Sequence, residues 1–177
     1  MSSISHFIPL NIAILTISDT RDLEHDQSGS FLMKAISECG HKLSEREIVS
    51  DDRYLIRSQL SQWIVSPHIE VILTTGGTGF SERDVTPEAV QPLIEKPIDG
   101  FGELFRQLSF EEIHTSTLQS RALAGITNRT GIFCLPGSTH ACRTAWTKIL
   151  KQQLDATHQP CNFVDHLIQR QERYAFL

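Results

Sequence analysis

The amino-acid sequence predicts an α/β protein built on a mainly parallel β-sheet. Three short apolar runs, residues 11–17, 71–75 and 131–135, have the composition of strands that are buried on both faces. Segments with helical periodicity separate these runs, and such alternation is typical of a parallel sheet. The 177 residues contain no internal repeat, low-complexity segment or linker, so we expect one domain over residues 1–177.

The N-terminal half contains two predicted helices and a weaker strand between them. Residues 27–39 have apolar side chains at helical spacing, and Gly40 follows where a helix end favours a positive φ. Residues 43–49 carry several charged or polar side chains, which indicates a strand near the sheet edge. A helix is then expected from Asp51 or Asp52 to Ile64.

The C-terminal half is expected to be mostly helical around its single strand. Thr86 is a predicted N-cap, because Pro87 follows it at the first helical position and an acid comes next. The other expected helices cover residues 101–112, 117–124, which Gly125 ends, and 141–154.

The composition narrows the function classes and the cellular location. The net charge of −5 argues against binding to nucleic acid, which usually requires a basic face. The four cysteines form no C-x-x-C pair, and we expect reduced thiols rather than disulfides. The N-terminus does not resemble a secretion signal, and no apolar run is long enough to span a membrane. We therefore expect a cytoplasmic protein with no membrane partner.

Each of the three buried strands runs into a turn of small polar residues. The turns are Ser18-Asp19-Thr20, residues 75–84 and residues 136–139. In open α/β sheets, ligands bind beyond the carboxyl ends of the strands. If the strands are parallel, all three turns meet at that edge and form the candidate site.

The strongest element of this site is the run Thr75-Gly76-Gly77-Thr78-Gly79. Glycines let the backbone approach a ligand and aim several N–H groups at it, and phosphate or carboxylate suits such a loop. The alternative is a tight turn whose glycines serve packing alone. The run matches neither the Walker A motif nor the dinucleotide fingerprint, because Glu82 stands where the latter has its last glycine.

Four aspartates lie near strand ends or helix starts, and two or three of them could bind Mg²⁺. They are Asp19, Asp51, Asp52 and Asp84. Mg²⁺ prefers a few carboxylates together with phosphates and water. The alternative role is helix capping, which is a strong alternative for Asp51 and Asp52.

The motif of residues 74–89, TTGGTGFSERDVTPEA, resembles the signature of the molybdenum cofactor biosynthesis proteins, which include the molybdopterin adenylyltransferases and a domain of gephyrin. Residues 101–106, 120–122 and 135–138 fit the family in order, and residues 108–113 and 141–146 look like its bacterial B branch. The match covers roughly residues 10–165. It implies a three-layer α/β/α fold, a molybdopterin-binding domain, and assembly as a homotrimer or homohexamer.

The resemblance also implies a reaction. Molybdopterin and Mg-ATP are brought together, the terminal phosphate of the pterin is adenylylated, and pyrophosphate leaves. Transfer of this kind needs alignment and charge neutralisation more than covalent help from the protein. By matching positions to the family, the resemblance implies that Asp84 is catalytic together with Asp52 or Asp51. It also implies that Asp84 and Asp52 position Mg²⁺ directly or through water. The nucleotide side is assigned to Ser18 and Asp19. The expected pterin and phosphate contacts are Thr75, Gly76, Gly77, Thr78, Gly79, Ser120, Arg121, Pro136, Gly137 and Ser138.

One departure from the family pattern concerns residue 140. The family often carries lysine there, whereas this chain has His140, which is mostly neutral near pH 7. Anion binding at this position is therefore expected to be weaker or pH-dependent. His140 keeps open a non-catalytic role as a molybdopterin-binding or carrier protein, whereas the intact Arg83-Asp84 favours an enzyme. An interaction scaffold is a third reading, but no long appended segment supports it.

Overall fold

The computed structural model describes residues 6–168. Its central sheet has six strands in the order β2-β1-β3-β6-β5-β4. Strands β1, β2, β3 and β6 are parallel, whereas β5 runs antiparallel to both β6 and β4. The strands are β1 (Asn11–Ile17), β2 (Lys42–Val49), β3 (Val71–Thr75), β4 (Lys96–Pro97), β5 (Leu123–Thr127) and β6 (Thr130–Leu135). The prediction of a mainly parallel α/β sheet, with the segment of residues 43–49 at an edge, is confirmed.

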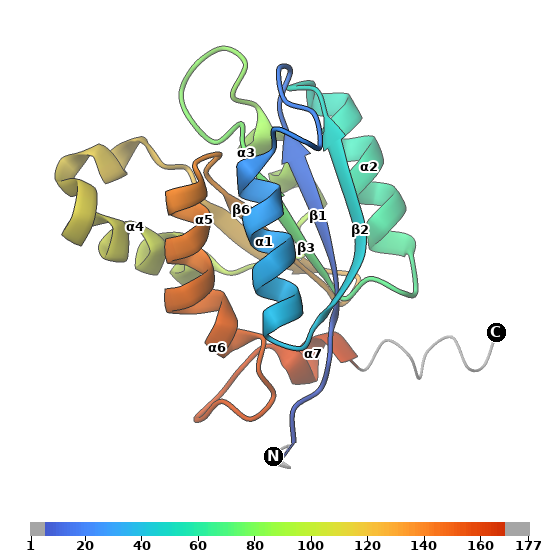
Figure 1. Ribbon diagram of the computed structural model, residues 1–177. Helices are drawn as coiled ribbons and strands as arrows, with labels where there is room; N and C mark the ends of the chain where they lie inside the picture. Colours follow the sequence, from blue (N-terminus) through green and yellow to red (C-terminus); the bar gives the residue numbers. More distant parts are fainter. Residues whose placement is uncertain (1–5, 169–177) are drawn as a thin grey trace.

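Helices cover both faces of this sheet and give the expected three layers (Figure 1). Alternate residues of β1 separate the two cores: Ile12 and Ile14 pack toward α1, α4 and α5, while Leu15 packs toward α2 and α3. The helices are α1 (Gln27–Glu38), α2 (Arg53–Val65), α3 (Thr86–Val90), α4 (Asp99–Ile113), α5 (Thr139–Ala145), α6 (Lys151–Gln153) and α7 (Val164–Ile168). The π-helical segment Trp146–Leu150 joins α5 to α6, and 3₁₀ helices span Gln91–Leu93 and His114–Gln119.

The helix predicted over residues 117–124 is wrong. In its place, the second 3₁₀ helix ends at Gln119 and strand β5 begins at Leu123. Strand β5 forms a hairpin with β6, in which Thr127 pairs with Thr130 across a two-residue turn. Both turn residues, Asn128 and Arg129, have positive φ angles of 44° and 64°, the geometry that two-residue hairpins favour. Pairing with a buried strand therefore overrides the local helical pattern.

The helix expected over residues 101–112 is present as α4, whose buried side chains include Phe101, Phe105 and Ser109. All four cysteines are free thiols, and burial raises the pKa of Cys134 to about 12. Within residues 6–168, no helix combines the length and apolarity that membrane crossing requires.

A buried histidine connects the N-terminal segment to the core. The His41 ring is 6% exposed and packs edge-on against Trp146. Its Nδ1 accepts a hydrogen bond from the Leu10 N–H at 3.1 Å, so this nitrogen carries no proton. Burial lowers the pKa of His41 below its ordinary value of 6.5, although the negative charge of Asp155 opposes the shift.

This histidine predicts a loss of stability in acid. The unfolded chain takes up a proton near pH 6.5 and the folded chain resists it, so the contribution is complete above that pH. It falls below that pH by up to about 1.4 kcal/mol per pH unit. In the His41→Asn variant, which keeps an acceptor near Nδ1 but cannot titrate, urea unfolding between pH 5 and 7 should show a flatter pH dependence. Identical slopes for the two proteins would contradict this account.

Candidate functional site

The ends of β1, β3 and β6 lie side by side at one edge of the sheet, as the sequence predicted, and the candidate site lies there. Strand β1 pairs with β3, and β3 pairs with β6, in a register that aligns Thr16 with Thr75 and Thr75 with Leu135. The loop of residues 76–85 leaves this edge as the projecting green segment of Figure 1. Its first N–H, from Gly76, donates to the Leu135 carbonyl at 3.1 Å and continues the ladder by one bond.

The first two loop glycines are required by both space and backbone angle. Gly76 has a φ of 109°, and a Cβ there would overlap the Ile17 carbonyl oxygen. Gly77 has a φ of 62°, and a Cβ there would overlap the Thr86 hydroxyl. A Cβ on Gly137 would lie 3.3 Å from the Gly76 Cα. The packing role that glycine turns often have is therefore present here.

Thr86 holds the loop instead of capping the next helix. Its hydroxyl donates to the Gly76 carbonyl at 2.9 Å, and its N–H donates to the Gly77 carbonyl at 3.0 Å. The N-cap residue of α3 is Val85, which has no capping side-chain bond. The predicted capping role is therefore wrong, because a loop carbonyl competes for the hydroxyl. Helix α3 has five residues, so its dipole adds little to the site.

Arg121 closes the other side of the loop. Its guanidinium donates to the carbonyls of Gly79 at 2.8 Å and Asp84 at 2.6 Å, and it forms an ion pair with Glu88. It also lies over the Phe80 ring. The planar fork of arginine suits several carbonyl acceptors at once. Arg121 was expected to contact the pterin. Its guanidinium instead bonds loop carbonyls, and it lines neither of the two cavities described below.

Among the four N–H groups of residues 76–79, those of Gly77 and Thr78 stay free. The Gly79 backbone lies against the Asp84 carboxylate and helps to lower its pKa, and the Gly76 N–H is used in the sheet. Within residues 6–168, no acceptor of the chain bonds the N–H of Gly77 or Thr78. Of the four N–H groups expected to face an anion, these two are available.

Asp84 has a low pKa and organises its own loop. Its carboxylate accepts bonds from the Ser81 N–H at 2.8 Å and the Ser81 hydroxyl at 2.6 Å. Burial alone would raise the pKa of Asp84, but these bonds and the one from Gly79 outweigh it and hold the pKa below its ordinary value. Asp84 is therefore a fixed negative charge near neutral pH.

Two cavities flank the glycine loop and share Gly77, Asp84 and Gly137. The first, here called the Ser138 cavity, has a volume of about 380 Å³ and lies between the loop, α4 and α5. The second, the Ser18 cavity, has a volume of about 360 Å³ and lies toward β1. The predicted residues that line the Ser138 cavity are Gly77, Thr78, Gly79, Asp84, Ser120, Pro136, Gly137 and Ser138. Those that line the Ser18 cavity are Ser18, Asp19, Asp51, Gly76, Gly77, Asp84 and Gly137.

The predicted residue Thr75 lines neither cavity. Its hydroxyl donates to the Pro136 carbonyl at 3.0 Å and so joins two of the three turns. A larger hollow of about 730 Å³ lies beyond Arg121, between α3, α4 and β5, but residues 75–79 do not reach it. We therefore place the candidate site in the two smaller cavities.

Asp19, Asp51 and Asp52 have different roles in and beside the Ser18 cavity. The Asp19 carboxylate accepts the Asp51 N–H at 3.2 Å and forms an ion pair with Arg83. Burial and then the nearby Asp19 raise the pKa of Asp51, although Arg83 opposes the shift. Asp52 instead caps α2 by accepting the N–H groups of Tyr54 and Leu55 at 2.8 and 2.9 Å. The alternative of helix capping is thus realised for Asp52, and Asp51 is the member of the pair that faces the cavity.

Arg21 and Glu112, which the sequence analysis did not single out, each line one of the cavities. Arg21 brings positive charge to the Ser18 cavity together with Arg83, which the motif had indicated. At the mouth of the Ser138 cavity, the Glu112 carboxylate pairs with the His140 ring. Glu112 lies on α4, and no local motif connects it to residue 140. Such contacts depend on how the helices pack, and the sequence alone does not predict them.

The description "Probable molybdopterin binding domain" belongs to a family model that matches residues 13–156. That span contains the glycine loop, both cavities and the residues around them. The chain belongs to the molybdenum cofactor biosynthesis family. Its role therefore lies in the biosynthesis of this cofactor.

Relatives of this family cover almost the whole chain. Molybdenum cofactor biosynthesis protein B of Escherichia coli (strain K12) is 55% identical over 168 residues, which are 94% of this chain and 99% of that protein. The same-named protein of Staphylococcus epidermidis is 47% identical and aligns with 82% of this chain and 85% of its own.

Solved structures of the family have the same fold. A crystal structure of molybdenum cofactor biosynthesis protein B has a TM-score of 0.84 at 38% identity and covers 93% of this chain and 98% of its own. The tungsten cofactor synthesizing protein MoaB from Pyrococcus furiosus has a TM-score of 0.73 at 33% identity, covering 81% and 92%.

The geometry of the loop predicts that alanine destabilises the protein at position 77 but not at position 100. Gly77→Ala should lower the free energy of unfolding by about 1–3 kcal/mol, because the positive φ and the Thr86 hydroxyl both exclude a Cβ. Gly100→Ala is the matched control, since no atom lies within 4 Å of a Cβ at that helical position, and it should raise stability by up to about 1 kcal/mol. Chemical denaturation measures both. Equal effects at the two positions would rule out the steric constraint.

Proposed function

We propose that this protein is a molybdopterin adenylyltransferase. The observation that carries the proposal is the pair of cavities that share Gly77, Asp84 and Gly137. A transfer between two substrates needs two adjoining binding spaces whose common wall holds the reacting phosphates. We assign molybdopterin to the Ser138 cavity and ATP to the Ser18 cavity.

In the proposed reaction, an oxygen of the terminal pterin phosphate attacks the α-phosphorus of ATP. A new P–O–P bond forms, the bond between the α-phosphorus and the bridging oxygen breaks, and pyrophosphate leaves with that oxygen. The N–H groups of Gly77 and Thr78 hold the attacking phosphate. Arg21 and Arg83 offset the charge of the nucleotide phosphates. This division follows the general need of phosphoryl transfer for positioning and neutralisation.

The carboxylates of the Ser18 cavity fit Mg²⁺ that arrives with the nucleotide. Asp19, Asp51 and Asp84 are hard oxygen donors around one cavity, and the Asp51 N–H donates to the Asp19 carboxylate at 3.2 Å. Within residues 6–168, no group of three His, Cys, Asp or Glu residues could hold a metal ion. The nucleotide phosphates would therefore complete the ligand set. We propose Asp84 and Asp51 as the residues that position the ion, with Asp52 acting through the helix cap. The ion, when bound, offsets phosphate charge.

Cytoplasmic location and assembly as a homotrimer or homohexamer belong to the same proposal. Large apolar side chains stay exposed on α4 and the segment that follows it, including Phe110, Ile113 and Leu118. Burial of such side chains in a subunit interface would stabilise an assembly. Light scattering measures the number of subunits.

The alternative is a non-catalytic molybdopterin-binding protein of the same pathway, and the His140–Glu112 pair favours it. That pair leaves no lysine charge at the mouth of the Ser138 cavity. The purified protein should be mixed with molybdopterin and Mg-ATP, and pyrophosphate and adenylylated pterin measured. We expect both products in equal amounts. Binding of the pterin without either product would establish the alternative.

Asp84 provides the sharper test of mechanism. Asp84→Asn keeps an acceptor for Ser81 but removes the charge, so turnover should fall by at least about tenfold, while the free energy of unfolding should change by about 1 kcal/mol or less. Asp22→Asn is the control, because Asp22 makes similar bonds to the N–H groups of Glu24 and His25 and lines neither cavity. Unchanged turnover in Asp84→Asn would make Asp84 a structural residue only.

A further inference from the structure

Two donors hold the turn after β6: Ser28, which lines neither cavity, and Arg21, which lines the Ser18 cavity. The Ser28 hydroxyl donates to the Gly137 carbonyl at 2.8 Å, and the Arg21 guanidinium donates to the same oxygen at 3.2 Å. Ser28 is 1% exposed and lies in the first turn of α1. These contacts join the segment after β1 to a residue that lines both cavities.

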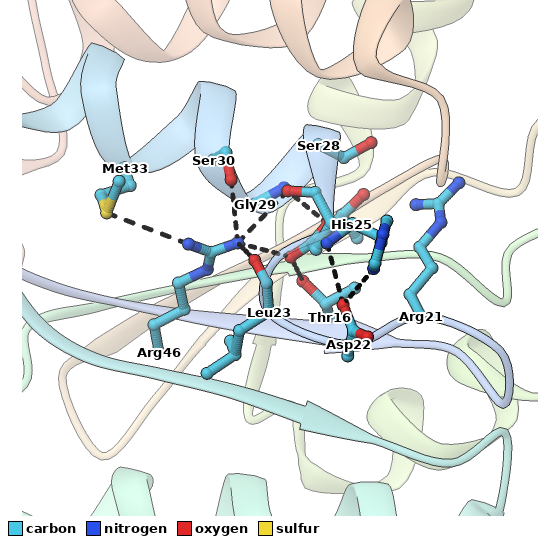
Figure 2. A network of polar contacts seen from close by, with 12 residues as sticks. Thr16, Arg21, Asp22, Leu23, His25, Ser28, Gly29, Ser30, Met33 and Arg46 are labelled. Carbon is cyan, nitrogen blue, oxygen red and sulfur yellow. Dashed lines mark hydrogen bonds and ion pairs between the residues drawn. The ribbon is translucent and has the colours of Figure 1, made fainter.

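A buried ionic network fixes the start of α1 and therefore Ser28 (Figure 2). Asp26 is fully buried and caps the helix by accepting the Gly29 N–H at 2.9 Å. Its carboxylate also accepts the Thr16 hydroxyl at 2.7 Å and the Arg46 guanidinium at 3.1 Å. A Cβ on Gly29 would overlap this carboxylate. Such a paired and fully bonded carboxylate gives the helix start one defined position.

The two hydrogen bonds to the Gly137 carbonyl also set the direction of the Ser138 N–H. A trans peptide is planar, so its C=O and N–H point in opposite directions. With the Gly137 oxygen aimed at α1, the Ser138 N–H points away from α1. Ser138 lines the Ser138 cavity, and within residues 6–168 its N–H has no hydrogen-bond acceptor in the chain. The Ser138 hydroxyl accepts the Ala141 N–H at 3.1 Å as the cap of α5, so its oxygen is fixed at the helix start while its O–H proton remains a separate donor.

We propose that Ser28 and Arg21 are positioning residues, which orient the Gly137–Ser138 peptide so that the Ser138 N–H becomes a third donor to the phosphate bound by Gly77 and Thr78. The inference rests on the proposed function, because the phosphate is that of the pterin. It adds Ser28, which lies outside both cavities, to the residues that determine affinity for the phosphorylated ligand.

The test compares molybdopterin with its dephosphorylated form in equilibrium binding to the full-length protein. Ser28→Ala removes the shorter of the two hydrogen bonds to the Gly137 carbonyl and leaves only the 3.2 Å bond from Arg21. Affinity for molybdopterin should therefore fall by up to about tenfold, the typical effect of one hydrogen bond to a charged group. Affinity for the dephosphorylated pterin should stay within about twofold, because that ligand has no phosphate for the N–H to bind. Ser30→Ala is the matched control, since this hydroxyl lies in the same helical turn but accepts from Arg46; both affinities should stay at the wild-type value.

Each outcome has a distinct meaning. Equal losses for both ligands in Ser28→Ala would show general damage to the site and overturn the positioning role, as would unchanged affinity for molybdopterin. The thermal unfolding midpoints of the two variants should match, which separates binding effects from folding. If the wild-type protein does not bind molybdopterin, both the proposed function and the positioning role are overturned. If the wild-type protein binds molybdopterin and Ser28→Ala binds it equally well, only the positioning role is overturned.

Discussion

The close approach of Gly76 to the end of β1 is the constraint on which the site depends. The backbone of this residue passes so near the Ile17 carbonyl that a side chain would not fit, and the Gly137 turn lies against its other side. This contact brings the three strand ends together. A bulkier residue at position 76 would separate the turns and, with them, the two cavities. The remaining features, including the bonds from Thr86 and the positive φ of Gly77, complete a turn that this approach makes possible.

The polar side chains around the loop serve mainly to direct its carbonyls. Arg121 takes the carbonyls of Gly79 and Asp84, Thr86 takes that of Gly76, and Ser28 takes that of Gly137. A peptide whose oxygen is held on one side presents its N–H on the other. An anion site can thus be built from backbone donors in a protein of net charge −5. Side-chain cations contribute by holding oxygen atoms away from the ligand as well as by attracting it.

The sequence was sufficient for the parts of the structure that depend on composition and local order. The apolar runs of β1, β3 and β6 predicted buried parallel strands, and the polar turns after them predicted a shared edge. Strand β5 was not predictable in the same way, because its conformation comes from pairing with β6 across Asn128 and Arg129. The helix-capping role predicted for Thr86 is wrong for a related reason, because its hydroxyl donates to the Gly76 carbonyl, ten residues away. Arg121 and Ser28 reach their partners only through packing of distant elements, and residue type alone could not separate a ligand contact from a contact with the loop.

The central claim is that the free N–H groups at the junction of the two cavities hold the phosphate of the pterin. A crystal structure of this protein with bound molybdopterin tests it most directly. The account predicts that the terminal phosphate lies within hydrogen-bond distance of the Gly77 and Thr78 nitrogen atoms, with the pterin in the Ser138 cavity. A phosphate bound elsewhere, with these two N–H groups facing only solvent, would contradict it.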